Sequence, residues 1–169
     1  MKVSTFAIKL WRWVSMLAFA AVLTYTYSNF DQNVAVHFTP QKQPDAFLQR
    51  DVLFYICVAI FLVTNTLVGL VARLFPRVPS AALPIPNQNL WAGHRTQLNE
   101  LTQNWFYALM AAINTVMALA LWVLGQLNKQ LGNSALGGHE WLLPVCTLIF
   151  AIVIVALPIR LMMKPANEE

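Results

Sequence analysis

Imidazole and carboxylate groups gather in two polar segments of this sequence, where their chemistry suits a metal site. His37 lies between Asp31 and Asp45, and His139 stands next to Glu140 further along the chain. Such groups bind zinc or copper. Nothing in their spacing places them together on one helix or strand. We therefore interpret His37 and Asp45 as groups that form hydrogen bonds within their own loop, and we expect neither a metal site nor a cofactor.

Nucleophilic catalysis finds no better support in the sequence. No nucleophile-elbow motif surrounds Ser15, Ser28, Ser80 or Ser134. His94 and Glu100 are six positions apart, so a helix would place them on different faces. We interpret His94, Arg95 and Glu100 as the solvated start of a helix, and we expect no catalytic residues and no enzymatic activity.

The composition of the sequence is apolar, and it limits the kinds of structural element that can position these residues. Of 169 residues, 58% are hydrophobic and 11% are charged, whereas soluble domains carry about 25% charged residues. The mean hydropathy is +0.56. These values exclude a soluble globular domain, a mainly disordered chain and a nucleic-acid-binding module. The lipid bilayer is therefore the expected surrounding of the protein, and nucleic acid is not an expected partner.

Four long runs with few charges predict membrane-spanning helices. The predicted spans are residues 10–29, 52–73, 103–127 and 141–162, with outer loops 30–51 and 128–140 and an inner loop 74–102. Each span can cross a hydrocarbon core of about 30 Å as a helix that rises about 1.5 Å per residue. The sequence thus predicts one domain, residues 1–169, of the all-α class: an integral membrane protein built as an antiparallel bundle of four transmembrane helices.

The distribution of basic residues predicts the orientation of this bundle. Eight of the eleven Lys and Arg residues lie in the amino terminus, the inner loop and the carboxyl-terminal tail or at the span ends next to them. Basic residues favour the cytoplasmic side of a membrane. We therefore expect both termini in the cytoplasm and a multi-pass protein of the cell (inner) membrane.

The middle of each predicted span lacks Asp, Glu, Lys, Arg and His, which argues against an ion-coupled transporter and against a haem protein. Two amides do occur there, Asn65 in the second span and Asn114 in the third, at similar depth. Each can bond to its own helix or to a threonine, the two can bond to each other and fix the register of the helices, or they can line a polar cavity.

Two further features concern helix packing. Pro158 predicts a kink or an early end of the fourth helix, because its ring obstructs the carbonyl of Ile154. Cys57 and Cys146 are predicted to lie at similar depth, and we interpret them as buried apolar side chains. They would meet only if the second and fourth helices were adjacent.

The first outer loop has the pattern of an ordered segment. Val34, Val36 and Phe38 alternate as in a short strand, and Pro44-Asp45 predicts a turn. The loop has an ordered series of recognisable positions, which are His37, Phe38, Pro44, Asp45, Phe47 and Arg50. With the inner-loop segment Pro86 to Trp91, this series resembles membrane proteins of the domain of unknown function 1648 type and the related SdpI-like immunity proteins.

This resemblance implies a role in sensing a secreted toxic peptide or in giving immunity to it. We accordingly expect a non-enzymatic protein that binds a peptide or a membrane-protein partner through the first outer loop. The candidate binding residues are the six named above, His37, Phe38, Pro44, Asp45, Phe47 and Arg50. The alternative is a structural accessory subunit of a larger membrane complex, for example a respiratory one.

Overall fold

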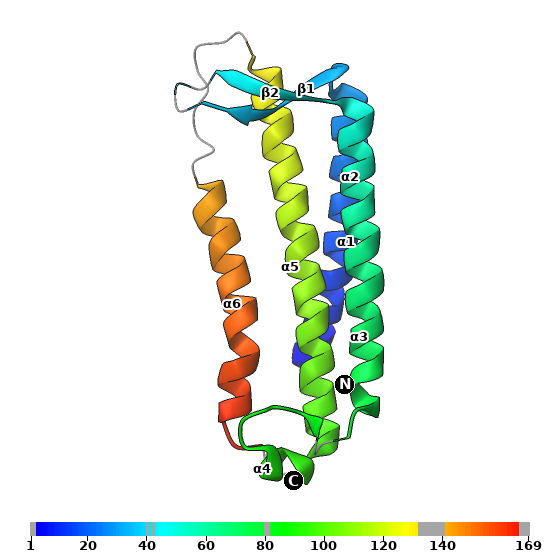
Figure 1. Cartoon of the computed structure of the whole chain (residues 1–169), viewed down its shortest axis with the longest axis vertical. Helices are drawn as coiled ribbons and strands as arrows, with labels where there is room; N and C mark the ends of the chain where they lie inside the picture. Colours follow the sequence, from blue (N-terminus) through cyan, green and yellow to red (C-terminus); the bar gives the residue numbers. More distant parts are fainter. Residues whose placement is uncertain (1–2, 40, 42, 80–81, 132–140, 166–169) are drawn as a thin grey trace.

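Four long helices, a β-hairpin and a folded loop between the second and third long helices make up the molecule (Figure 1). We keep for this loop the name under which it was predicted, the inner loop. The computed structural model describes residues 3–39, 41, 43–79, 82–131 and 141–165. In chain order the elements are α1 (Val3–Asn29), β1 (Asn33–Phe38), β2 (Pro44–Gln49), α2 (Arg50–Val63), η1 (Thr64–Val68), α3 (Gly69–Leu74), η2 (Phe75–Arg77), α4 (Gln88–Ala92), α5 (Arg95–Lys129) and α6 (Leu142–Met162).

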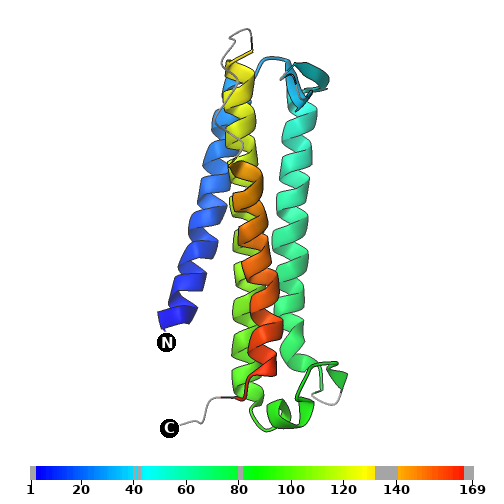
Figure 2. The ribbon, with the colours of Figure 1, turned by 90° about the vertical axis from the view of Figure 1, so that its left-hand side faces the viewer.

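Four helices are long and apolar enough to cross a membrane, as the sequence predicted. They cover Val3–Asn29, Arg50–Arg77, Arg95–Lys129 and Leu142–Met162, the second being the continuous run from α2 to η2. The first and third begin well before the predicted spans, because a charge-poor run marks only the apolar part of a helix. The start of α1 and the end of α6 lie at the same end of the bundle (Figure 2).

The expectation of an all-α fold needs one correction. β1 and β2 pair as a two-stranded antiparallel sheet between α1 and α2. The β-branched and aromatic residues of this segment favour an extended backbone, and the hairpin returns the chain to the start of α2. The molecule is therefore mostly helical, with a β-hairpin at the end of the bundle opposite the inner loop (Figure 1).

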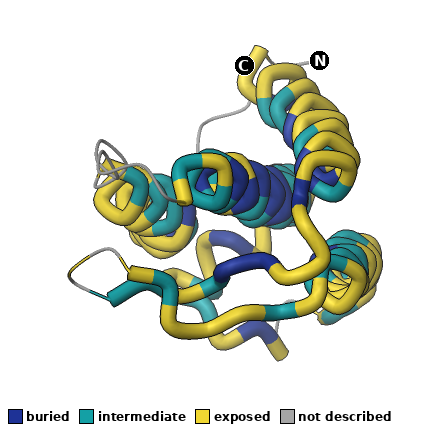
Figure 3. Tube along the Cα trace, turned by 90° about the horizontal axis from the view of Figure 1, so that it is seen from above, coloured by how far each residue is buried: buried dark blue, intermediate teal, exposed yellow. Residues whose placement is uncertain are grey.

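α5 is the central helix, and α1, α3 and α6 all pack against it. Among the described elements α5 has the largest number of buried residues, and its trace in the view from above carries many of the buried positions (Figure 3). Small residues allow this close packing: Ala111 and Ala112 are fully buried, and a Cβ added at Gly125 would lie 3.1 Å from Thr26 Cγ2 of α1. α5 thus provides the surface that aligns the other spans.

The two cysteines lie on different sides of the bundle. Cys57 is buried in a cluster with Phe19 and Leu23 of α1 and Leu121 of α5. Cys146 is half-buried on α6, which packs on α5. α2 and α6 stand apart in the view from above (Figure 3). In the described part of the structure α2 and α6 are therefore not adjacent, and the two cysteines do not meet. Both thiols are free.

The inner loop caps the end of α6. The Trp91 indole N–H donates to the Leu161 carbonyl at 3.0 Å, and the Asn87 amide donates to the Met162 carbonyl at 3.1 Å. Asn87 adopts a left-handed backbone with φ of 56°, which asparagine tolerates better than most residues. α6 continues through Pro158 to Met162, so the early end is wrong as the outcome at this proline, and the kink stays a prediction. The loop supplies donors to carbonyls that a helix end leaves unpaired.

The start of α5 is also more than a solvated helix end, which corrects that interpretation of the sequence. Arg95 Nη2 donates to the carbonyls of Phe75, Pro76 and Val78 at 3.2, 3.4 and 2.6 Å. Glu100 accepts a hydrogen bond of 2.9 Å from the Thr5 hydroxyl of α1. These partners come from distant parts of the sequence, which a local pattern of polar residues does not reveal.

Candidate functional site

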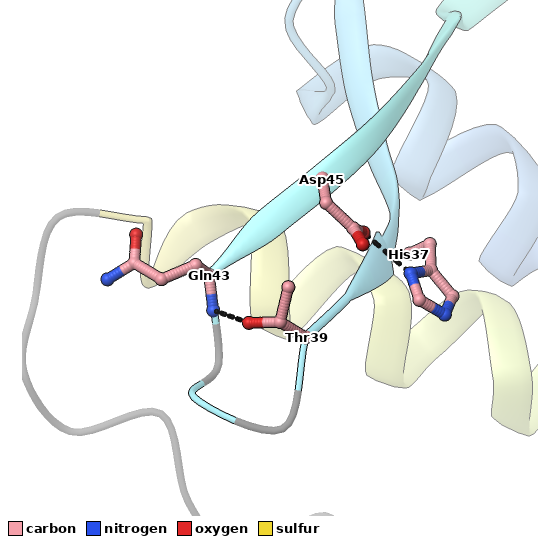
Figure 4. Close-up of polar contacts among 4 residues, drawn as sticks. All are labelled: His37, Thr39, Gln43 and Asp45. Carbon is pink, nitrogen blue, oxygen red and sulfur yellow. Dashed lines mark hydrogen bonds and ion pairs between the residues drawn. The ribbon is translucent and has the colours of Figure 1, made fainter.

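Two hydrogen bonds join Thr39, which follows β1, to Gln43, which precedes β2. The Thr39 amide donates to the Gln43 carbonyl at 2.8 Å, and the Gln43 amide donates to Thr39 Oγ1 at 3.2 Å (Figure 4). The strand predicted over Val34 to Phe38 is confirmed. The turn predicted at Pro44-Asp45 is wrong, because Thr39 closes the turn earlier and Pro44 begins β2.

His37 and Asp45 face each other across the two strands. His37 Nδ1 lies 2.5 Å from Asp45 Oδ1 (Figure 4). The two side chains are 68% and 44% exposed, so water weakens their attraction and the pair contributes little to stability. It leaves a polar, solvent-accessible group on the hairpin surface, available to a ligand.

The described residues supply no third metal ligand beside His37 and Asp45. Among the residues that the structure describes, no group of three His, Cys, Asp or Glu side chains lies close enough to hold a metal ion. His139 and Glu140, the other ligands considered, lie outside the described residues.

A side-chain amide docks β1 onto the end of α5. The Ala35 amide donates to Asn128 Oδ1 at 2.9 Å, and Asn128 Nδ2 donates back to the Ala35 carbonyl at 3.0 Å. Val34 and Ala35 are 1% and 0% exposed. The Asn128 side chain therefore bonds to β1 as a neighbouring strand would, and it holds the hairpin on the bundle.

This docking determines which backbone groups of β2 face outward. Residues directly opposite in an antiparallel pair alternate between exchanging hydrogen bonds and pointing away from each other. Ala35 lies opposite Phe47 and points its amide and carbonyl toward Asn128. The bond from the Arg50 amide to the Gln32 carbonyl fits the same alternation. The Phe47 amide and carbonyl must therefore point away from β1, to the open edge of β2.

That edge is the most exposed part of the hairpin. β2 is mostly exposed and lies outside β1 when the bundle is viewed from above (Figure 3). The Phe47 side chain is 53% exposed, whereas Phe38 and Pro44 are half-buried. No residue in the described part of the chain pairs with the outer edge of β2. An apolar ring and a free backbone donor and acceptor thus occur at one residue.

Arg50 lies apart from His37 and Asp45, at the base of the hairpin. Its guanidinium donates to the Phe30 carbonyl at 3.3 Å and lies over the Tyr27 ring. The Tyr27 hydroxyl donates to Asp51 Oδ1 at 3.0 Å. Arg50 therefore joins the end of α1 to the start of α2.

A polar cavity of about 240 Å³ opens beside this base. It is lined by Gln32, Asn33, Gln49, Arg50 and Asp51. Sequence reasoning identified Arg50 but missed Asp51, whose signal was its position in the first turn of a helix.

The amides in the apolar spans meet as a pair. Asn65 Nδ2 donates to Asn114 Oδ1 at 3.0 Å, and Asn114 Nδ2 donates to Asn65 Oδ1 at 3.2 Å. Asn114 is 0% exposed. Asn65 also donates to the Phe61 carbonyl of its own helix at 2.9 Å, within the run where the helix widens into the π-turn η1. Asn65 therefore makes two of the contacts considered from the sequence, one with its own helix and one with Asn114.

We predict that this pair couples the stabilities of its two residues. In a double-mutant cycle with Asn65→Leu and Asn114→Leu, the coupling free energy should be about 0.6–1.7 kcal/mol, the range of interhelical hydrogen bonds in membranes. The cycle is measured by reversible unfolding in mixed micelles. Asn65→Leu combined with Asn104→Leu is the control, because Asn104 bonds to Thr5 instead. Strict additivity for the Asn65 and Asn114 pair would show that the contact carries no energy.

No family model, curated protein or solved structure matches this chain. The fold itself defines the class: a multi-pass membrane protein with four candidate spans and a docked β-hairpin at one end.

Proposed function

We propose that the protein binds an extended segment of a peptide or protein partner along the open edge of β2, in a non-enzymatic sensing or immunity-like role. The observation that carries this proposal is the outward-pointing amide and carbonyl of Phe47. An unpaired strand edge is a template on which another chain can add a strand. In this mode the backbone hydrogen bonds supply affinity, and side-chain contacts supply selectivity.

The side chains beside this edge favour a partner of mixed character. Phe47 offers an exposed ring to an apolar side chain of the added strand. The His37 and Asp45 pair lies toward the turn, and the cavity with Arg50 and Asp51 lies at the base. A segment with a central apolar residue and polar or charged flanking residues would match this order.

The distribution of charge supports a placement of this surface outside the cell. The hairpin lies at the end of the bundle away from the inner loop (Figure 1), which carries Arg77 and Arg95 and directly follows Arg73. The positive-inside bias supports cytoplasmic termini and a hairpin exposed outside the cell (inner) membrane. A secreted or periplasmic peptide is the partner that such a surface would meet.

The test uses a phage-displayed library of random decapeptides, selected on the full-length protein in lipid nanodiscs. Selected peptides should bind Phe47→Pro about tenfold or more weakly, because proline removes the outward amide. The hairpin itself should persist, since that amide takes no part in the β1 and β2 ladder. Phe47→Ala is the matched control: it removes the ring, keeps the amide and should weaken binding less.

Two results would contradict the proposal. Peptides that bind wild type and Phe47→Pro equally would place recognition elsewhere, and a selection that yields no hairpin-dependent binder would remove it. Isolation of a stoichiometric larger complex from native membranes, together with either result, would favour the structural accessory subunit.

A further inference from the structure

The ends of α1 and α5 lie at the same end of the bundle as the hairpin (Figure 1). A second cavity is lined by residues from these two helix ends. Its volume is about 300 Å³. From α1 and the residues after it come Tyr25, Asn29 and Asp31, and from α5 and its end come Lys129 and Leu131. The cavity thus lies where two candidate membrane spans end, at the depth expected for lipid headgroups.

Opposite charges line this cavity without neutralising each other. Lys129 and Asp31 form no ion pair with each other. Lys129 Nζ donates to the Tyr25 hydroxyl at 2.7 Å and lies over the same ring, which fixes the ammonium at the cavity wall. An ammonium has three donors, so two remain for a ligand.

The other wall offers acceptors. Asp31 makes no hydrogen bond or ion pair within the described part of the chain. Asn29 donates through Nδ2 to the Tyr25 carbonyl at 2.7 Å, which leaves its Oδ1 as an acceptor. α1 ends at Asn29, and the carboxyl end of a helix carries partial negative charge. This wall therefore suits a cation with N–H donors.

We propose that the cavity binds an aminophosphate zwitterion, the headgroup of phosphatidylethanolamine. Its phosphate would contact Lys129, and its ammonium would contact Asp31 and Asn29. Phosphatidylglycerol has no cation for Asp31, and the choline group of phosphatidylcholine has no N–H donor for Asn29. The acyl chains of the lipid would extend from the cavity along the apolar surfaces of α1 and α5.

The experiment measures lipid binding to the full-length protein by native mass spectrometry from micelles doped with one phospholipid at a time. Wild type should retain phosphatidylethanolamine about tenfold more strongly than phosphatidylglycerol or phosphatidylcholine, as expected for charge-assisted contacts. Asp31→Asn should lose most of that preference, because it removes the carboxylate that faces the ammonium. Lys129→Gln should lower the retention of all three lipids, because each carries the phosphate that Lys129 would contact. Asp31→Lys should reverse the preference toward phosphatidylglycerol, because two cations would then face the phosphate.

Lys9→Gln is the matched control, since Lys9 lies exposed near the other end of α1. Circular dichroism and size exclusion identify variants that remain folded, and the gain of phosphatidylglycerol in Asp31→Lys cannot arise from unfolding. Equal retention of all three lipids by wild type, an unchanged preference in Asp31→Asn, or unchanged retention in Lys129→Gln would overturn the proposal. A separate arm adds soluble phosphoethanolamine. If the free molecule binds and the lipid does not, the lipid is the wrong source of this chemistry.

Discussion

Replacing Trp91 by alanine should lower the free energy of unfolding by about 3–5 kcal/mol, the cost of removing a large aromatic side chain from a packed core. Trp91 is 1% exposed and packs with Leu83, Leu98 and Leu161. Its indole donates to the Leu161 carbonyl at 3.0 Å, and the Arg160 guanidinium lies over its ring. The substitution therefore removes apolar contacts, a hydrogen bond and a cation–π contact together.

The measurement is unfolding in mixed micelles followed by circular dichroism, which does not depend on tryptophan fluorescence. Trp91→Phe keeps most of the apolar contacts and should cost about 1 kcal/mol, the net value of one hydrogen bond. Trp13→Ala is the matched control because Trp13 is 62% exposed on α1. A loss below about 1 kcal/mol for Trp91→Ala would show that the inner loop does not hold α6.

The same contact shows where sequence reasoning reaches its limit. Composition and the charge-poor runs predicted four spans, because the bilayer constrains the length and polarity of every helix that crosses it. The Pro86 to Trp91 segment was recognisable as a motif. Its role as a cap of α6 was not, since Trp91 and Leu161 are far apart in the chain and only the packed bundle brings them together.

The contact between the side-chain amides of Asn65 and Asn114 was partly predictable from the sequence. Depth along antiparallel spans is readable from sequence, and it placed Asn65 and Asn114 at the same level before rotation about each helix axis was known. The rotation determines whether Asn65 faces α5 and whether Asn114, on α5, faces the helix that carries Asn65. The π-turn at Thr64–Val68 contributes to that rotation, and no residue pattern predicted it.

For the hairpin, too, the sequence predicted one part of the structure and not the rest. The alternation of Val34, Val36 and Phe38 predicted a strand, because period two is a local property. The position of the turn, by contrast, depends on the contact between Thr39 and Gln43. The open edge of β2 depends on Asn128, which contacts the hairpin from the end of the third span. A polar residue at the end of an apolar run was its only signal in the sequence.

Replacing Arg95 by methionine should lower the free energy of unfolding by about 2–4 kcal/mol, because hydrogen bonds to charged groups contribute about 1.5–3 kcal/mol and their carbonyl acceptors would lose a donor. The second span ends in η2, where Pro76 interrupts the regular helix. A helix end leaves its last carbonyls unpaired and carries partial negative charge. Arg95 donates to the carbonyls of Phe75, Pro76 and Val78, so its cation neutralises that end.

Arg95→Lys keeps the charge and should recover part of the loss, since an ammonium can reach fewer of three spread acceptors than a planar guanidinium held against the Phe75 ring. Arg73→Met is the matched control: Arg73 is exposed on the last turn of α3, and its replacement removes one positive charge at the same end of the bundle. Unfolding in mixed micelles should therefore separate Arg95→Met from Arg73→Met by at least about 1.5 kcal/mol. Equal losses would mean that Arg95 acts only through net charge, and that the contact between the second and third spans at this end is held by packing alone.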